Sequence, residues 1–573
     1  MQPLLSIDGL NILFTSDGDT SVAVKSNSFT VNKGELVAIV GESGSGKSVT
    51  ALSVLQLLPK QAKISGKILF LNDDQQPVDL LKLSAKEISS IRGNKIAMIF
   101  QEPMTSLNPV FTCGYQVMEA IQLHQKVSKE IAKKKAIELF EKVKLPDPAN
   151  LLSRYPHELS GGQKQRVMIA MAMSCNPSIL IADEPTTALD VTVQKTILEL
   201  IKSLQKQNNM GVIFITHDLG VVADIADKIL VMHKGEIVEQ GSAKDILKAP
   251  QHPYTKALLA CRPAGKTKGK RLPVVNDFMK QDAEKFIEKL DVPEEPKNQD
   301  TKSETKKTIL EVKNLHVHFP IKKNLFGKPV EFFKAVDDVS FTVQQGDIVG
   351  LVGESGCGKT TLGRTILQLI KPTSGKILLE GKDLTQTNKE VLRNMRKDLQ
   401  IVFQDPYGSL NPRITIGDAI LEPLKVHSVL SNNKQRKEKV MELLEKVSLD
   451  SGHFNRYPHQ FSGGQRQRIC IARALALDPS FLIFDESVSA LDVSVQAQVL
   501  NLLNDLKKEF GFTAIFISHD LSVVHYICNR ILVMYKGKIV EEGTADEVYH
   551  SPKNEYTQNL VNAIPGKAIY QSS

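Results

Sequence analysis

A glycine-rich motif occurs twice in this chain, and each copy is followed by the same series of polar residues. The first copy, GESGSGKS, spans residues 41–48, and the second, GESGCGKT, spans residues 353–360. Matching residues keep a nearly constant offset, which is 312 at the two lysines of the motif and 302 at a serine, a glutamate and a histidine further on. Such a repeat indicates two copies of one domain. The 573 residues suffice for two hydrophobic cores.

The repeated motif is suited to holding phosphate. Its glycines let backbone N–H groups converge on a phosphate at the N-terminus of a helix, where the helix dipole favours negative charge. The apolar run 36–40 predicts a buried strand directly before the first loop. We expect the lysines to contact the β- and γ-phosphates of a nucleotide, and the final hydroxyl to bind Mg²⁺. The expected nucleotide-binding residues are Gly41, Gly44, Ser45, Gly46, Lys47, Ser48, Gly353, Gly356, Cys357, Gly358, Lys359 and Thr360.

Each half places four further polar residues at the ends of apolar runs. The carboxyl ends of parallel strands are where an open α/β sheet binds its ligands. An Asp is expected to complete the magnesium site, and the Glu that follows it to orient or deprotonate the attacking water. A Gln can reach the metal or that water, and a His can clamp the γ-phosphate against the Glu. In chain order these are Gln101, Asp183, Glu184 and His217 in the first half, and Gln404, Asp485, Glu486 and His519 in the second.

A second glycine-containing motif, Ser-Gly-Gly-Gln, narrows the class of nucleotide hydrolase. A serine hydroxyl and two glycine N–H groups at the start of a helix form another phosphate site, which cannot serve its own half because the glycine loop already holds that nucleotide. The expected contacts are Ser160, Gly161, Gly162, Gln163, Ser462, Gly463, Gly464 and Gln465.

With this motif the chain resembles the ATP-binding-cassette (ABC) ATPases over nearly all of its length except a linker. The resemblance implies two RecA-like α/β cores, each with an antiparallel β subdomain and an α-helical subdomain. It also implies that the two halves close head to tail within one molecule, so that the signature motif of each half faces the ATP and Mg²⁺ of the other.

Three further segments look like parts of the cassettes of bacterial oligopeptide, dipeptide and nickel importers. They are the Ser-Leu-Asn-Pro loops in 101–109 and 404–412 and the His-Pro-Tyr-Thr segment at 252–259. A similar but weaker pattern occurs at 554–560, and an ordinary terminal helix is the alternative interpretation of that pattern. The resemblance implies an energy-coupling ATPase at the cytoplasmic face of the inner membrane, with two integral-membrane permease subunits and an extracytoplasmic substrate-binding protein.

Fused two-cassette members of this group resemble the ATPases of glutathione and peptide-antibiotic importers, which suggests a peptide-like cargo. The cargo itself stays open among dipeptides, oligopeptides, glutathione, peptide antibiotics and nickel. Many members carry a cysteine cluster for an iron–sulfur centre after the His-Pro-Tyr-Thr segment, but only Cys261 is present here, so we expect no such cluster. Phe461 replaces the usual signature leucine, and Ser487 stands where the first half has Pro185. We therefore expect two competent sites that can differ in rate.

The aromatic residue that stacks on adenine is open between several positions. Phe14 is the candidate in the first half, and Phe319 or Phe332 in the second, with core packing an equal alternative for each.

A second class of function is a soluble tandem-cassette ATPase that acts on ribosomes or nucleic acid. The net charge of +8 is too diffuse to indicate nucleic-acid binding, and the importer-type segments favour transport. No run approaches the ~18 apolar residues that span a bilayer, and the N-terminus lacks a secretory signal. An exporter motor is disfavoured because exporter cassettes are commonly fused to their membrane spans.

The expected organisation follows from these patterns. Helix-period patterns in 102–158 and 405–460, such as 131–143 and 436–447, predict a helical subdomain in each half. A charged segment poor in apolar residues predicts a flexible linker, with one short helix near 283–290. The expected domains are a first ATPase domain 1–242, an importer-type extension 243–262, the linker 263–308, a second ATPase domain 309–544 and a C-terminal extension 545–573.

Overall fold

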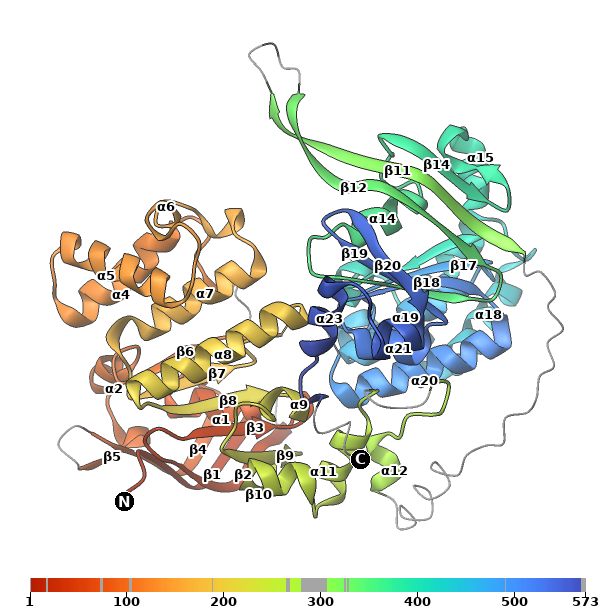
Figure 1. Cartoon of the computed structure of the whole chain (residues 1–573). Helices are drawn as coiled ribbons and strands as arrows, with labels where there is room; N and C mark the ends of the chain where they lie inside the picture. The colour runs from red at the N-terminus through yellow and green to blue at the C-terminus, as the bar shows by residue number, and fades with distance from the viewer. Residues whose placement is uncertain are drawn as a thin grey trace. The chain divides into compact units, whose positions relative to one another are not determined.

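The computed structural model describes residues 2–16, 19–72, 76–101, 106–187, 189–263, 268–279, 307–323, 326, 329–489 and 491–567. The chain forms two compact units (Figure 1). Unit 1 comprises Met1–Leu189, Val193–Ala260 and Pro565–Ser573, and unit 2 comprises Asp190–Thr192 and Cys261–Ile564. The helix expected near 283–290 lies outside the described residues.

Unit 1 combines an antiparallel sheet, a mostly parallel sheet and a set of helices. Its strands are β1 Leu5–Ser16, β2 Asp19–Val31, β3 Leu36–Val40, β4 Ala62–Leu71, β5 Pro77–Asp79, β6 Ile96–Ile99, β7 Ile179–Asp183, β8 Gly211–Thr216, β9 Lys228–His233 and β10 Glu236–Ser242. Its helices are α1 Lys47–Val54, α2 Ala85–Ile91, α4 Cys113–Gln125, α5 Lys129–Lys142, α6 Pro148–Leu151, α7 Gly161–Ala172, α8 Val191–Asn208, α9 Leu219–Val222, α10 Ala243–Lys248 and α11 Pro253–Ala260.

The two sheets of unit 1 place the phosphate loop between them. The antiparallel sheet has the strand order β2-β1-β4-β5, and the larger sheet has the order β10-β9-β3-β8-β7-β6. Strands β3, β7 and β8 are parallel and buried along their whole length, as the unbroken apolar runs predicted. One hydrophobic cluster joins residues of both sheets to Ala51 and Val54 of α1. Helix α1 is therefore fixed by packing on both sheets, and the loop before it is fixed with it.

Unit 2 repeats this architecture. Its strands are β11 Thr308–Lys323, β12 Pro329–Gln344, β13 Ile348–Val352, β14 Ser374–Leu379, β15 Lys382–Asp383, β16 Leu399–Val402, β17 Phe481–Asp485, β18 Thr513–Ser518, β19 Arg530–Tyr535 and β20 Lys538–Thr544. Its helices are α12 Val275–Phe278, α14 Lys359–Ile366, α15 Lys389–Met395, α16 Pro406–Ser409, α17 Ile416–Val426, α18 Asn433–Lys446, α19 Gly463–Leu475, α20 Val493–Phe510, α21 Leu521–Ile527, α22 Ala545–His550 and α23 Glu555–Asn562.

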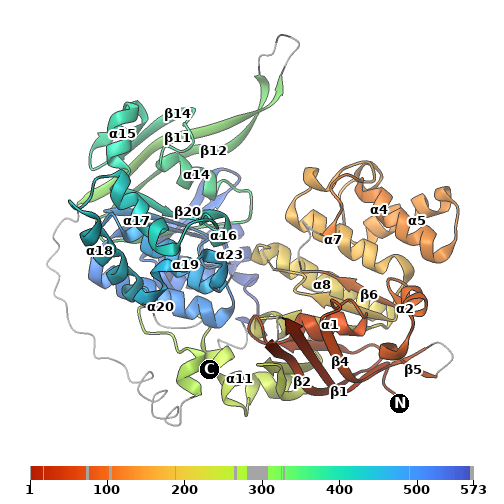
Figure 2. The same cartoon turned by 180° about the vertical axis from the view of Figure 1, so that it is seen from behind.

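The sheets of unit 2 have the orders β12-β11-β14-β15 and β16-β17-β18-β13-β19-β20. Its core cluster includes Leu362 and Ile366 of α14 together with residues of both sheets. The long hairpin β11–β12 extends past its sheet neighbours (Figure 2). The predicted fold class, two α/β cores with antiparallel β subdomains, is confirmed.

A separate group of helices completes each unit, as predicted. In unit 1, α4, α5 and α7 gather away from β1 and β2 in both views (Figures 1 and 2). Helix α5 begins at a cap where the Ser128 hydroxyl accepts the N–H of Ile131, and α18 begins where the Asn432 side chain accepts the N–H of Gln435. These helices contain the periodic segments that the sequence pointed to.

Part of the segment expected to be a linker packs against unit 2. The Leu272 N–H donates to Asn501 Oδ1 at 2.9 Å, and Asn501 Nδ2 donates to the Leu272 carbonyl at 2.8 Å. Leu272, Val275 and Phe278 are buried. Residues 268–279, which we name the docking segment, are therefore an ordered part of unit 2. The flexible linker predicted for 263–308 does not describe this stretch.

Within the described ranges, none of the helices combines the length and the apolar character that crossing a bilayer requires.

Candidate functional site

The glycine loop of unit 1 closes around the ammonium group of its own lysine. Lys47 Nζ donates to the carbonyls of Gly41 and Glu42 at 2.7 and 2.8 Å, and the side chain is buried. In unit 2, Lys359 Nζ makes the same two contacts with Gly353 and Glu354, at 2.7 and 2.8 Å. Both loops thus present a buried cation at the start of a helix, which is where a phosphate binds.

Glycine is required where each loop enters its helix. Gly46, the N-cap of α1, has a φ of 99°, and a Cβ there would lie 2.5 Å from the Ala23 carbonyl oxygen. Gly358 has a φ of 111°, and a Cβ would lie 2.0 Å from the Ala335 oxygen. The backbone can therefore approach the neighbouring strand only without a side chain at these positions.

A hydroxyl and a carboxylate meet beside each loop. Ser48 Oγ donates to Asp183 Oδ1 at 2.9 Å, and Thr360 Oγ1 donates to Asp485 Oδ1 at 3.0 Å. Burial raises the pKa of Asp183 to about 6, although the bond from Ser48 opposes this shift, and burial also raises the pKa of Asp485. A divalent cation would offset the cost of burying these charges, and oxygen atoms are the ligands that Mg²⁺ prefers. The residues present fit a magnesium site.

The loop of unit 1 also holds a polar atom that a nucleotide could satisfy. Ser45 Oγ is buried and has no hydrogen-bond partner among the described residues. A buried hydroxyl without a partner costs free energy, so a phosphate oxygen here would be favoured. In unit 2 this position is Cys357, whose sulfur lies 3.9 Å from Lys359 Nζ.

Three donors meet at one oxygen of the Glu184 carboxylate. Gln101 Nε2 lies 3.2 Å, His217 Nδ1 3.3 Å and Thr187 Oγ1 2.8 Å from Oε2. Burial acts to raise the pKa of Glu184, but the contacts with His217 and Thr187 outweigh it and lower that pKa to about 2. The residue has a φ of 46°, a left-handed conformation that is rare outside glycine and typical of active sites.

The second carboxylate has fewer donors. Gln404 Nε2 lies 2.9 Å and His519 Nδ1 3.5 Å from Glu486 Oε2, and Glu486 has a φ of 47°. Ser489, which corresponds to Thr187, donates to the backbone oxygen of Glu486 at 2.8 Å and not to the carboxylate. Burial acts to raise the pKa of Glu486, but His519 lowers it overall. The residue at the Thr187 position was not identified from the sequence, and it makes the two sites chemically different.

The signature residues lie at a helix start in each unit. Ser160 is exposed and caps α7: its hydroxyl accepts the Gln163 N–H at 3.3 Å, while its own N–H donates to Gln163 Oε1 at 3.0 Å. Ser462 and Gln465 make the same pair of bonds at the start of α19. Within the described part of each unit, these side chains bond to each other and not to the loop of the same unit.

The sequence of each unit matches the same known family model. The model described as ABC transporter matches residues 24–187 and again 336–489, which together cover more than half of the chain. The chain belongs to the ABC transporter family. It is an ABC-type ATPase with two cassettes. A second model, described as the C-terminal region of oligopeptide/dipeptide transporters, matches residues 238–283 and 540–569, behind each cassette.

Curated relatives match the chain almost from end to end. The glutathione import ATP-binding protein GsiA of Pectobacterium atrosepticum is 48% identical over 98% of this chain and 89% of its own length. The protein of the same name from Escherichia coli K12 is 49% identical over the same shares. Among solved structures, the dimeric cassette MJ0796 with ADP and phosphate is 28% identical, covers 41% of this chain and 99% of its own, and has a TM-score of 0.38.

An aromatic pocket lies beside the loop of the second cassette. It has a volume of about 410 Å³ and is lined by Phe333 and Tyr535 together with loop residues that include Cys357. Neither Phe319 nor Phe332, the candidates named from the sequence, is among its lining residues. Phe333 pairs with Phe319 across β11 and β12, where several register shifts occur. Phe332 and Phe333 are neighbours on β12, and neighbouring strand residues point to opposite faces, so Phe333 and not Phe332 lines the pocket.

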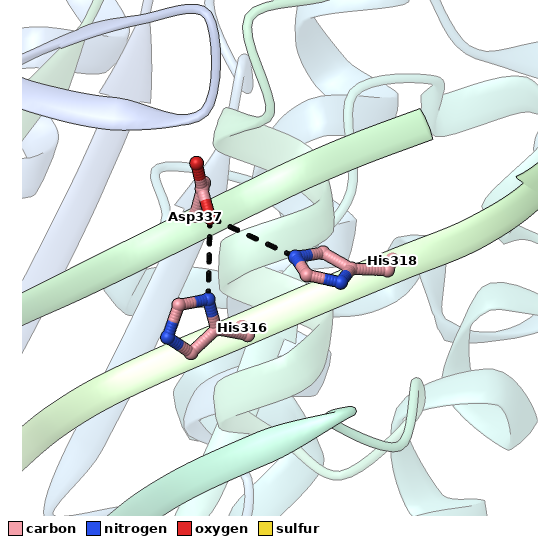
Figure 3. Close-up of side chains that lie close together, drawn as sticks. All are labelled: His316, His318 and Asp337. Carbon is pink, nitrogen blue, oxygen red and sulfur yellow. Dashed lines mark ion pairs between the residues drawn. The ribbon is translucent and has the colours of Figure 1, made fainter. Parts of the chain in front are cut away.

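A cluster of ligating side chains also lies on the antiparallel sheet of the second cassette. His316 Nδ1 and His318 Nε2 lie 3.3 and 3.8 Å from Asp337 Oδ1 (Figure 3). The backbone amide after Asp337 already donates to His316 Nδ1 at 3.2 Å, and the ammonium groups of Lys334 and Lys538 lie 3.5 and 3.6 Å from Asp337 Oδ2. We interpret the cluster as a polar network in which Lys334 and Lys538 pair with Asp337, since a metal ion would have to displace that amide and face two cations.

Proposed function

We propose that this chain is the ATP-hydrolysing, energy-coupling subunit of a bacterial importer for glutathione or related peptide-like solutes. The supporting observation is the near end-to-end match to proteins named for glutathione import, at 48–49% identity. An oligopeptide/dipeptide-type C-terminal region behind each cassette agrees with a peptide-like cargo.

Hydrolysis in this proposal depends on the two oxygens of each catalytic glutamate. Oε2 of Glu184 is held by Gln101, His217 and Thr187, whereas Oε1 accepts no hydrogen bond within the described part of the chain. Oε1 is therefore available to orient a water and take its proton as the water attacks the γ-phosphate. Mg²⁺, held by Ser48 and through water by Asp183, would neutralise charge on the phosphates.

Gln101 and His217 would report the state of the nucleotide. Both contact the catalytic glutamate, and Gln101 lies two residues after the end of β6 and precedes the helical group of unit 1. A γ-phosphate that attracts either side chain would change that contact and shift the helices. We propose that the exposed Ser160 and Ser462 each close over the nucleotide of the other cassette, in one head-to-tail pair within the molecule.

A groove on the second cassette is suited to a permease. It has a volume of about 410 Å³ and includes Leu369, Phe403 and Val426 among its lining residues. Leu369 and Val426 are 50% and 52% exposed, although both are apolar. Phe403 directly precedes Gln404, so a helix in this groove would sense the ATP site. We propose that a cytoplasmic helix of one of two permease subunits docks here, with the chain on the cytoplasmic face of the membrane and a substrate-binding protein outside.

The test is transport in a reconstituted system. The chain would be combined with the permease and binding-protein subunits of the same organism in vesicles, and uptake of labelled glutathione, a dipeptide and Ni²⁺ would be compared. We expect ATP-dependent uptake of glutathione or a peptide, absent when both Glu184 and Glu486 are replaced by Gln. Uptake of Ni²⁺ alone, or ATPase activity stimulated by ribosomes without permeases, would contradict the proposal.

A further inference from the structure

In each cassette, one glutamate carboxylate on a strand of the larger sheet accepts hydrogen bonds from the C-terminal extension. Glu239 of β10 accepts the backbone N–H groups of Gln251 and His252 at 2.7 and 3.1 Å, directly before α11. In the second cassette, Glu541 of β20 accepts the N–H groups of the two residues before Glu555, at 2.7 and 3.1 Å. Both short helices are therefore held in one orientation against the cassette.

Each of these helices carries a tyrosine that reaches the phosphate loop. Tyr254 is fully buried, and its hydroxyl accepts the N–H of Glu42 at 3.0 Å. The Tyr556 hydroxyl accepts the N–H of Glu354 at 2.9 Å. The same hydroxyl of Tyr254 lies 3.4 Å from the Glu42 carboxylate, to which it donates. Glu42 and Glu354 are the second residues of the two loops, so the extension forms part of the wall of each ATP site.

The tyrosine and the loop lysine hold opposite ends of one peptide group. The peptide between Gly41 and Glu42 has its carbonyl bonded to Lys47 at 2.7 Å and its N–H bonded to Tyr254 at 3.0 Å. In the second cassette the same clamp is formed by Lys359 at 2.7 Å and Tyr556 at 2.9 Å. A lysine that turns to a nucleotide phosphate would release its carbonyl, and the tyrosine would still hold the N–H of this peptide.

The rings are themselves fixed by neighbours of different type in the two halves. Tyr254 packs on His233 with ring centroids 4.1 Å apart, and Tyr556 packs on Tyr535 at 4.3 Å. The tyrosine N–H is capped by His252 in the first half and by Asn554 in the second, at 3.1 and 2.9 Å. The supporting residues differ, but the hydroxyl contact with the loop is the same.

We propose that Tyr254 and Tyr556 are positioning residues of the two ATP sites. Each hydroxyl keeps the second peptide of the loop in place, so that the following N–H groups stay directed at the phosphates. The C-terminal extension is then a component of the nucleotide site and not only an appendage of the cassette. This inference rests on the proposed binding of ATP at the two loops.

The test is removal of the hydroxyl alone. Tyr254→Phe would be made in a Lys359→Ala background, so that only the first site binds MgATP, and Tyr556→Phe in a Lys47→Ala background. We expect the Kd for MgATP to rise about five- to ten-fold, which corresponds to the free energy of one hydrogen bond. The KM should change more than kcat. Tyr526→Phe, which loses a buried hydroxyl bonded to the Lys270 carbonyl, is the matched control and should leave the Kd unchanged.

Hydrogen exchange provides a second measurement on the unmodified chain. The amides of Glu42 and Glu354 should be protected without nucleotide, and the protection should be lost in the matching phenylalanine variants. Rapid exchange of these amides, or an unchanged Kd in both variants, overturns the inference. If instead the unmodified chain fails to bind MgATP and Lys47→Ala changes nothing, the proposed function itself is wrong.

Discussion

Replacing Asn501 by Ala should release the docking segment from the second cassette. The Asn501 side chain makes two hydrogen bonds with the backbone of Leu272, at 2.9 and 2.8 Å, and the two residues are only 6% and 1% exposed. Each bond contributes a net ~0.5–1.5 kcal/mol, so the variant should lose about 1–3 kcal/mol of docking free energy. That range corresponds to a roughly 5- to 150-fold rise in the population of the open segment.

Amide hydrogen exchange measures this directly, because the Leu272 N–H is itself the donor in one of the two bonds. Its protection factor should fall by the same roughly 5- to 150-fold, whereas amides in the buried strand β17 should keep theirs. Gln498→Ala is the matched control on the same helix, since Gln498 Oε1 accepts a hydrogen bond from Arg468 Nη2 at 2.6 Å and, among the described residues, makes none with the docking segment. Equal exchange of Leu272 in the two variants, or no protection in the unmodified chain, would refute the reasoning.

Three further predictions concern the ATP sites and the permease groove. Glu184→Gln together with Glu486→Gln should slow hydrolysis by about 10²- to 10⁴-fold, because the base is lost while the phosphate contacts remain, and a phosphate-release assay checks this. Lys47→Ala and Lys359→Ala should each reduce the calorimetric stoichiometry from two MgATP to one; a single site in the unmodified chain would contradict this. Val426→Glu should abolish permease-stimulated ATPase activity and leave basal activity intact, since it places a carboxylate beside the apolar side chains of the groove; normal stimulation would argue for another docking surface.

The sequence predicted those parts of the fold and site in which chemistry restricts the residue type. A phosphate loop needs glycine where φ is positive and a lysine at a fixed spacing, so Gly46 and Lys47 could be predicted from the sequence alone. The α/β character of each half followed from the buried parallel runs and the repeat, whereas the RecA-like core and the antiparallel subdomain were implied by the resemblance to ABC ATPases. The roles of the site residues stay predictions, although the structure gathers Gln101, Glu184 and His217 as expected.

Contacts between distant segments could not be predicted in the same way. Tyr254 and Tyr556 keep the offset of 302 that the catalytic histidines show, which was a usable signal. The role of these tyrosines could not be predicted from the sequence, because the contact joins residues far apart in the chain: Glu42 lies 212 residues before Tyr254. Thr187 and Ser489 have similar side chains, but one bonds to the carboxylate and the other to the backbone, and only coordinates distinguish these.

The sequence did not predict that the docking segment is ordered, because of the composition of its surroundings. Leu272, Val275 and Phe278 are among its buried residues, but they stand beside a long charged stretch that dominates any average over the region. A few buried apolar side chains in and before the short helix α12 are enough to hold the segment to an existing surface, since each buried side chain of this size contributes about 1.5–3 kcal/mol as an upper estimate.

The docking segment also changes which stretch of chain joins the two cassettes. Met279 and Lys307 both belong to unit 2, so the part of the chain between them has both of its ends on the same unit. Doubling the number of residues between those two ends would cost only about 0.6 kcal/mol, and the cost would fall on the second cassette. Unit 1 ends at Ala260 and unit 2 continues from Cys261, so the length of the chain at this boundary, and not that of 280–306, sets the effective concentration of one cassette at the other. A reporter domain inserted between 280 and 306 would therefore leave the pairing of the cassettes unchanged, whereas a few residues added after Ala260 would dilute each cassette from its partner.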